Sequence, residues 1–487
     1  GDDAKNSVVI EERGVGNTEK WVSVGGKLVN GGPFIATGGK VIVDLKGGDD
    51  SLTIRSAKGG SYVDASIKYD VDLGAGNDSF TFSPSSVTGG SLLFDRLTTG
   101  DGKDKVTLNL GVLTSTTVGL SEGAFVNLGA GDDQATLAWK TATDSTLAFG
   151  ASGLAAVGFD FGLGKDKLTV DRGDVSGGEV NVAADLGDAF ASGDVEVGDD
   201  GNDTAKITGN GKTTNGADVT YTVYGGKGND SVSFDDDRTD GDGSHQTRTR
   251  THFDLGAGND SLSVRADGDR RGRGGVEDGD HVEWELEVEL GEGDDKYAQT
   301  IAPGTWGLTA GAAFSGHVEG EAGDDKITVS SVTKTLNLDG AFDVIVNGGG
   351  GDDRLGVALG NVERHGEGHF NVEVRGRGSD DLTGSDDDFI NASANFLAGS
   401  TPNPTLQNGG PGTPGYVPTA SFLLLGDDGA DHVGIKVKNG GKDLSVHTHI
   451  EPGDDNGDDL NEHVEGEVEV EHGPEDESGD DNGGNDG

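Results

Sequence analysis

Thirteen aspartates recur along the chain in one local setting, and their side chains are the ones best suited to do chemistry. In every copy a Gly lies two positions before the Asp and an apolar residue lies two positions after it. A carboxylate is a hard oxygen ligand, and a glycine turn can aim backbone carbonyl groups at the same point. The pattern therefore predicts repeated binding of a divalent cation. The candidate ligands are Asp50, Asp78, Asp104, Asp133, Asp166, Asp203, Asp230, Asp260, Asp295, Asp325, Asp353, Asp380 and Asp431.

The elements that must position these aspartates repeat along with them. Successive aspartates are 26 to 37 residues apart, except for a last interval of 51 residues. A fixed recurrence of this length is typical of a repeat architecture rather than of separate globular domains. Around Asp260 the apolar residues alternate, with Phe253 and Leu255 before the turn and Leu262 and Val264 after it. Such alternation on both sides of a glycine turn indicates strand, turn and strand, with one face directed inward.

Strands that recur in one order predict an all-β fold, a right-handed parallel β-helix of about 13 coils of roughly 30 residues each. Stacking at about 4.8 Å would place the same turn of every coil in one column. Unit negative charges about 5 Å apart repel by roughly 1 kcal/mol in water and by more near a protein surface. A divalent cation between successive turns would neutralise them, and Ca²⁺ accepts flexible oxygen geometry better than Mg²⁺. The alternative is that Asp simply favours tight turns, without any metal.

Two segments carry a known motif. The segments "GGKGNDSVS" at 225–233 and "GGGGDDRLG" at 348–356 match the nonapeptide G-G-x-G-x-D-x-U-x in every fixed position. The chain here resembles the RTX, or haemolysin-type, calcium-binding repeats. In that family the turn carbonyls and the Asp of adjacent turns share each Ca²⁺. The resemblance implies the same ligand role for the thirteen aspartates.

The chain also departs from that family. RTX nonapeptides follow one another in tandem, whereas here one nonapeptide occurs in each longer repeat. This arrangement implies a wider β-helix with one calcium column instead of two. Lys46, Asp199, Glu321 and Asp427 replace the second Gly of the motif, and we expect those turns to be built differently.

Composition narrows the classes of partner. A formal charge of −52 disfavours nucleic acid and anionic membranes and favours cations, although salt-rich surroundings would also explain it. The chain has no Cys and no Met, and it starts at Gly1. We expect a secreted protein, extracellular or on the cell surface, whose signal peptide has been removed. No apolar run approaches the length of a membrane span.

Changes in composition divide the chain into five parts. The expected parts are an N-terminal cap or first coil at 1–40, solenoid repeats at 41–383, a Pro-rich excursion at 384–420, a last coil at 421–450 and an acidic tail at 451–487. The tail carries sixteen acidic residues and no Lys or Arg, which predicts disorder. Its alternating valines also make it a candidate strand for assembly.

No pattern of residues typical of nucleophilic catalysis is found. The sequence predicts a calcium-stabilised structural protein of an extracellular fibre, surface layer or biofilm matrix, whose expected partners are calcium ions and copies of itself joined head to tail. One alternative is a β-helical lyase or epimerase acting on polysaccharide, with a site in 235–300 near Arg248, Arg250, Arg270 and Arg271. Another is an adhesin stalk or passenger domain that displays the excursion. An extracellular polysaccharide is a further candidate partner.

Overall fold

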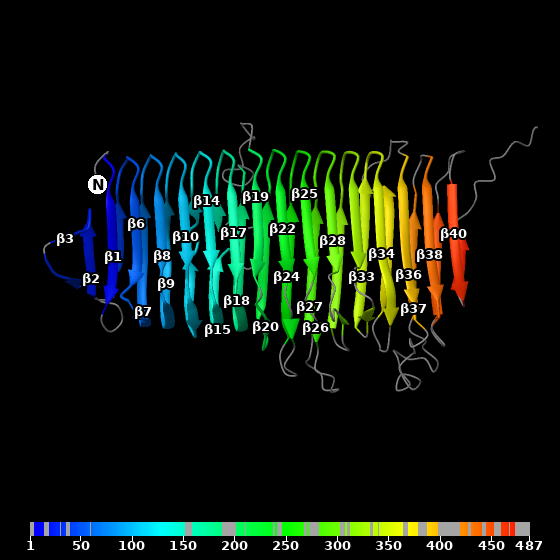
Figure 1. Ribbon diagram of the computed structural model, residues 1–487, viewed down its shortest axis with the longest axis horizontal. Coiled ribbons are helices and arrows are strands. Elements are labelled where there is room, and N and C mark those ends of the chain that lie inside the picture. Colours follow the sequence, from blue (N-terminus) through cyan, green and yellow to red (C-terminus); the bar gives the residue numbers. More distant parts are fainter. Residues whose placement is uncertain are drawn as a thin grey trace, which may run out of the picture.

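The protein is described by a computed structural model that is all-β in the residues it describes. The strands stack along one axis, from the N-terminus to the C-terminal coils (Figure 1). The described residues are 4–472, except for 14–18, 30, 36–38, 59, 151–157, 188–200, 210, 237–238, 241–245, 267–269, 272–281, 302–306, 309–311, 332–334, 339, 364–368, 378–386, 398–418, 427–429, 441–444, 452–458 and 467.

One wall of the solenoid, the post-turn sheet, is formed by the strands that follow each glycine turn. All neighbouring strands in it are parallel. In stacking order they are β1 (Ser7–Arg13), β6 (Ser51–Ser56), β8 (Ser79–Ser83), β10 (Lys105–Asn109), β14 (Gln134–Ala138), β17 (Lys167–Arg172), β19 (Thr204–Gly209), β22 (Ser231–Asp236), β25 (Ser261–Ala266), β28 (Lys296–Ile301), β31 (Lys326–Ser331), β34 (Arg354–Glu363), β36 (Phe389–Phe396), β38 (His432–Asn439) and β40 (Asp459–Gly466).

The facing wall, the pre-turn sheet, contains the strands that lead into the turns. Its neighbours are also parallel. They are β5 (Lys40–Asp44), β7 (Tyr62–Asp72), β9 (Ser86–Thr98), β12 (Thr117–Leu120), β13 (Val126–Asn127), β15 (Thr141–Phe149), β16 (Phe159–Asp160), β18 (Asp174–Asp185), β21 (Asp218–Tyr224), β24 (Thr247–Asp254), β27 (Val282–Glu289), β30 (Ala312–Glu319), β33 (Ala341–Gly349), β35 (Phe370–Arg377), β37 (Thr419–Leu425), β39 (Ser445–Glu451) and β41 (Val468–His472).

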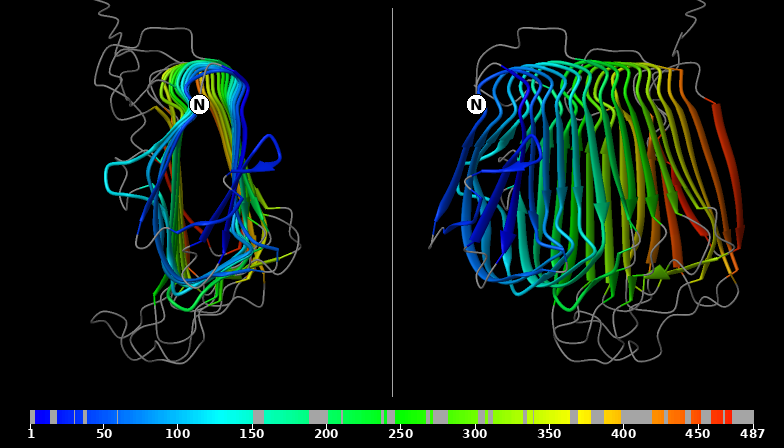
Figure 2. Two further views of the ribbon diagram at one scale, coloured as in Figure 1. Left: turned by 90° about the vertical axis from the view of Figure 1, so that its left-hand side faces the viewer. Right: turned by 60° about the vertical axis from the view of Figure 1, so that its left-hand side comes forward.

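Short strands add pairings at the edge opposite the glycine turns. They are β11 (Val112–Thr114), β20 (Thr213–Thr214), β23 (Thr239–Asp240), β26 (Arg270–Arg271), β29 (Gly307–Leu308) and β32 (Leu336–Leu338). Figure 1 shows the tight glycine turns along the upper edge of the stack and β20 and β26 along the lower edge. Seen end-on, the two sheets face each other across a narrow interior (Figure 2). The expected parallel β-helix is confirmed.

The interior is filled by the apolar residues of the alternating pattern. Because the coils stack in register, each such residue lies over its equivalent in the next coil, as Leu52 does over Phe80. An aromatic column runs through the later coils. Its ring centroids are 4.7 Å apart for Trp284 and Phe314, 5.5 Å for Phe314 and Phe342, and 5.4 Å for Phe342 and Phe370. These rings are buried, so core packing couples each coil to the next.

The N-terminal edge of the post-turn sheet is covered by antiparallel pairing. Strand β2 (Glu19–Val24) pairs antiparallel with β1, and β3 (Lys27–Leu28) and β4 (Phe34–Ile35) pair antiparallel with β2. Beneath this cap the buried carboxylate of Glu12 lies 2.7 Å from Nζ of Lys20 and accepts a hydrogen bond of 3.0 Å from the Tyr69 hydroxyl. The cap covers the backbone edge of β1, which would otherwise be open.

One segment differs from the expected division of the chain, and the acidic tail contains the strand that is one of its two expected states. Strand β36 lies inside the range predicted as an excursion, and it pairs in parallel with β34 and β38 as a regular member of the post-turn sheet. Residues 398–418, which hold the prolines of that range, lie outside the described residues. In the acidic tail, β40 and β41 continue the two sheets by pairing with β38 and β39.

Within the described part of the chain there is no helix with the length and apolar character needed to cross a membrane.

Replacing one ring of the aromatic column tests the packing of the core. We expect Phe342→Ala to lower the free energy of unfolding by about 3–5 kcal/mol, because a cavity opens between two stacked rings. Phe125→Ala, at a position that is 43% exposed, should change it by less than about 0.5 kcal/mol. Urea unfolding followed by circular dichroism measures both. Equal losses in the two variants would contradict the stacked core.

Candidate metal centre

The glycine turns bring successive coils into very close contact. In the turn before Asp260, Gly256 has φ of 83°, a backbone conformation that L side chains rarely adopt. A Cβ on Gly256 or Gly258 would also collide with a backbone carbonyl of the preceding coil. Lys46 and Glu321 occupy the second motif position with φ of 77° and 74°, so these turns keep the same left-handed backbone, and the expectation of a different build there is wrong. The equivalent residues 199 and 427 lie outside the described residues.

The motif aspartates form one continuous ladder inside these turns, which we call the inner ladder. The backbone N–H of each Asp donates to Oδ1 of the Asp in the next coil, at 2.6–2.9 Å, in twelve consecutive bonds. The ladder begins at Asn6, whose N–H donates to Asp50. Its members are Asp50, Asp78, Asp104, Asp133, Asp166, Asp203, Asp230, Asp260, Asp295, Asp325, Asp353, Asp388 and Asp431.

One predicted ligand is therefore replaced by another residue. The ladder position after Asp353 belongs to Asp388, which accepts the N–H of Asp353 and donates its own N–H to Asp431. Asp380, which the repeat pattern selected, lies outside the described residues. The pattern missed Asp388 because no Gly lies two residues before it. The signal that could have found it is the alternation of apolar residues at 390, 392, 394 and 396.

The inner-ladder carboxylates are buried and incompletely satisfied. Every one of them is between 0 and 2% exposed. Their Oδ1 atoms accept backbone N–H groups, but a second buried oxygen has no hydrogen-bond partner in several members of the ladder. These are Oδ2 of Asp50, Asp78, Asp133, Asp260, Asp295, Asp325 and Asp353. A buried carboxylate oxygen without a partner is costly, so each one marks a point where a cation or a proton would stabilise the fold.

A backbone carbonyl oxygen from the next coil lies near the Oδ2 atom of the inner-ladder Asp. A Cβ built on Gly320 would collide both with Oδ2 of Asp325 and with the carbonyl oxygen of Gly348. A Cβ on Gly348 would collide with Oδ2 of Asp353 and with the carbonyl oxygen of Gly376. Carboxylate and carbonyl oxygens of successive coils therefore converge, and this all-oxygen donor set has the chemistry that Ca²⁺ prefers.

Burial shifts the titration of these carboxyl groups. Desolvation raises the pKa of Asp78 and of Asp295 to about 6, and that of Asp133 to about 7. It raises the pKa of Asp260 to about 8 and that of Asp353 to about 9. Hydrogen bonds from the backbone N–H groups oppose the rise, and the charge of neighbouring ladder members adds to it. Without a cation, part of the ladder is protonated at neutral pH.

A second ladder, the outer ladder, runs along the exposed side of the same turns. It uses the residue just before the inner-ladder Asp wherever that residue is Asn or Asp, and it is interrupted at Lys103 and Lys165, which have no acceptor oxygen in the side chain. Its bonds run in the opposite direction. Asn229 donates its N–H to Oδ1 of Asn202 in the preceding coil, and Asn259 donates its own to Oδ1 of Asn229. Asp324 and Asp352 continue the ladder in the same way. Both Asn and Asp serve here because only an acceptor oxygen is needed.

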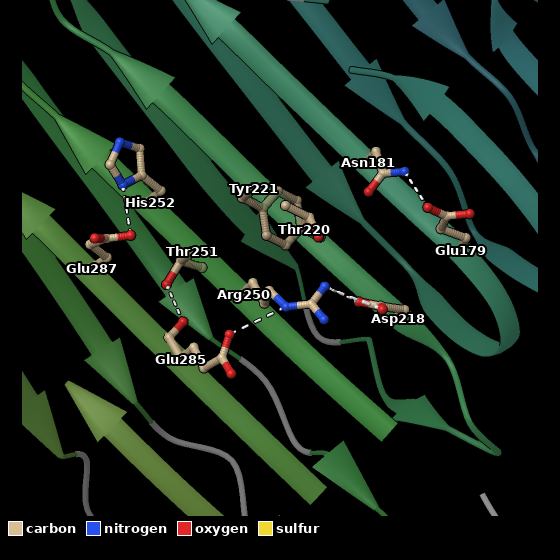
Figure 3. A pocket seen from close by; sticks show the side chains of 10 residues that line it. All are labelled: Glu179, Asn181, Asp218, Thr220, Tyr221, Arg250, Thr251, His252, Glu285 and Glu287. Atoms are coloured by element: carbon tan, nitrogen blue, oxygen red, sulfur yellow. Dashed lines mark hydrogen bonds and ion pairs between the residues drawn. The ribbon is translucent and has the colours of Figure 1, made fainter. Parts of the chain in front are cut away.

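A groove with a volume of about 340 Å³ lies away from the turns, over β18, β21, β24 and β27 (Figure 3). Arg250 lies there, 3.1 Å from Oδ1 of Asp218 and 3.3 Å from Oε2 of Glu285. The nearby Arg248 lies 2.7 Å from Oε2 of Glu283. The groove includes part of residues 235–300, the range predicted to hold the site of a polysaccharide enzyme. The guanidinium groups of Arg248 and Arg250 are already engaged by carboxylates. Of the side chains of Arg270 and Arg271 in β26 the structure gives no description.

Comparison of the chain with protein-family models, with curated proteins and with solved structures gives no match.

The raised pKa values predict how the cation-free protein responds to pH. These carboxyl groups have a pKa of 3.8 in the unfolded chain and of about 6 to 9 in the folded protein. Between these pH values the folded protein therefore binds protons that the unfolded chain has released. Their stabilisation is complete below about pH 4 and is lost as the pH rises through about 6 to 9. In EDTA, Tm measured by circular dichroism should therefore fall from pH 5 to pH 9. A Tm that rises over this range would contradict the buried ladder.

Proposed function

We propose that the protein is a calcium-stabilised structural rod that works outside the cell. The inner ladder supports this proposal through its residue choice. Asn could accept the same backbone N–H without burying a charge, and Asn is used at four outer-ladder positions, at 77, 202, 229 and 259. Yet every inner-ladder residue from Asp50 to Asp431 is Asp. A hydrogen-bond acceptor alone does not require that choice, whereas a cation does.

Calcium would supply positive charge between coils, held by the carboxylates and by the turn carbonyls of the following coil. It would thereby join neighbouring coils at the turn edge, where the electrostatic repulsion is greatest. Because the unfolded chain has no preformed site, the free energy of binding becomes free energy of folding. Calcium would therefore stabilise the folded chain most where the ion is abundant, as it is outside cells. On the order of ten ions per chain would fill the column.

The rod would serve as a building unit of an extracellular fibre, surface layer or biofilm matrix. Among the described strands, β5 pairs only with β7, and β41 pairs only with β39. These two strands belong to the same sheet and lie at opposite ends of the stack, and each leaves one edge without a described partner. Pairing of β41 in one copy with β5 in the next would extend that sheet and build a filament.

A polysaccharide-active enzyme is the second candidate, supported by the groove over β18, β21, β24 and β27. The charge-paired state of Arg248 and Arg250 weighs against it, because an acidic sugar would have to compete with Glu283 and Asp218. Incubation with acidic polysaccharides and measurement of new unsaturated ends would reveal a lyase, an activity that a purely structural rod would not show.

A matched pair of substitutions tests the calcium ladder. Asp260→Asn removes a buried charge and keeps an acceptor for the N–H of Asp230. We expect its Tm in EDTA at pH 9 to equal or exceed that of the parent protein, and its rise in Tm on adding Ca²⁺ to be smaller. The control is Asp294→Asn, which makes the same charge change on the outer ladder, where Asn is native in other coils. Calorimetry and thermal melts measure both effects.

The control should keep the full response to calcium. If the two variants respond alike, or if Ca²⁺ does not raise the Tm of the parent protein, the calcium column is wrong.

Electron microscopy tests assembly separately. In the presence of Ca²⁺ we expect filaments several times longer than one chain, and in EDTA we expect few or none, because the end coils lose the ions that would stabilise them. Negative-stain images over a range of protein concentrations provide the measurement. Single rods at every concentration, with calcium bound, would support a monomeric stalk instead of a polymer.

A further inference from the structure

A group of mixed metal-ligating side chains lies outside the inner ladder, on the outer face of the pre-turn sheet. His252 and Asp254 belong to β24, and Glu289 belongs to the neighbouring strand β27. One ligand atom from each of the three lies within 4.8 Å of the others. Ligands of a tetrahedral Zn²⁺ site are about 2.0–2.2 Å from the metal and thus roughly 3.4 Å from one another. Small side-chain rotations would close the site.

His252 is held in the orientation that metal-binding histidines adopt. Its Nδ1 lies 3.3 Å from Oε2 of Glu287, the residue paired with it on β27. Figure 3 shows the other ring nitrogen directed away from Glu287. Histidines that bind metal through one nitrogen usually donate the other N–H to a carboxylate, which fixes the ring and its tautomer. The ring also contacts Tyr224 and is only 8% exposed, although its strand position faces outward.

In the residues that the structure describes, the two carboxylates at this site lack the Lys or Arg partner that equivalent carboxylates have in the early coils. Asp254 and Glu289 are direct neighbours in the strand register, and like charges at such positions are destabilising. At the same position in early coils, Asp44 is paired with Lys46, and Asp72 lies 2.6 Å from Arg96. Among the described residues, no Lys or Arg forms an ion pair with Asp254 or Glu289.

We propose that His252, Asp254 and Glu289 bind one divalent transition-metal ion, with Glu287 as the residue that orients His252. One imidazole and two carboxylates suit Zn²⁺ better than Ca²⁺, which prefers oxygen alone. Three protein ligands leave a fourth position for water or for an anionic group of a partner molecule. The site is independent of the inner ladder, and it does not rest on the proposed role of calcium.

Cobalt provides a direct probe, because Co²⁺ takes Zn²⁺ sites and absorbs visible light when bound by nitrogen and oxygen ligands. The full chain is titrated with Co²⁺ in saturating Ca²⁺ and again in its absence. We expect one tight site with visible absorption in both conditions, displaced by Zn²⁺. His252→Ala should remove it, and Glu287→Ala should weaken it by about 10- to 100-fold.

The matched control is His317→Ala. His317 also faces outward, with Nε2 3.1 Å from Oε1 of Glu319, but its side chain is 41% exposed. Among the described residues it belongs to no group of three ligand atoms within 4.8 Å of one another. This variant should bind Co²⁺ as the parent protein does. Should His252→Ala fail to fold, the double variant Asp254→Asn, Glu289→Gln tests the same site with isosteric side chains.

Retained tight binding in either folded site variant would overturn the proposal. So would a loss in His317→Ala equal to that in His252→Ala, since binding would then be a general property of exposed histidines. Visible absorption that appears only with several Co²⁺ ions per chain would overturn it in the same way.

Discussion

Buried negative charge along one edge of the rod is the constraint on which the rest of the structure depends. Stacking the coils in register is what buries the apolar residues, and the same register superimposes one Asp per coil. The twelve hydrogen bonds between ladder members, together with the bond from Asn6 to Asp50, satisfy Oδ1 of each carboxylate and leave the charge in place. The fold must therefore take up protons or cations at this edge. The raised pKa values of the inner-ladder carboxyl groups and their Oδ2 atoms without hydrogen-bond partners both follow from this buried charge.

The two ladders show two roles of Asp in these turns, one as a hydrogen-bond acceptor and the other as a buried negative charge. The outer ladder needs only an acceptor, so Asn229 and Asp294 serve equally well in it. The inner ladder keeps a full charge at a buried position, at a cost that a purely structural turn would avoid. Asn6, before the first Asp of the ladder, serves only as a donor to Asp50.

The two long edges of the rod are specialised differently. The glycine turns repeat with little variation because a side chain would collide with the adjacent coil at several positions. The opposite edge carries short strands, and the outer faces of the walls carry charged residues whose types change from coil to coil. The groove near Arg250 and the group around His252 both lie on the outer face of the pre-turn sheet, where substitution leaves the core unchanged. We therefore expect binding of specific partners on the outer faces of the sheets. The glycine turns, which vary little between coils, are expected to stabilise the stack.

The sequence by itself determined the local units: the glycine turns, the alternating strands that flank them, and twelve of the thirteen inner-ladder aspartates, because these features depend on neighbouring residues. It could not place Asp388, since the motif lacks its Gly there and only pairing with Leu355 and Val433 aligns Ile390 in the stack. Only the tertiary structure decided that β2 covers the edge of β1 by antiparallel pairing. It also brought His252, Asp254 and Glu289 together, because strand register joins residues 35 and 37 positions apart that no local pattern connects.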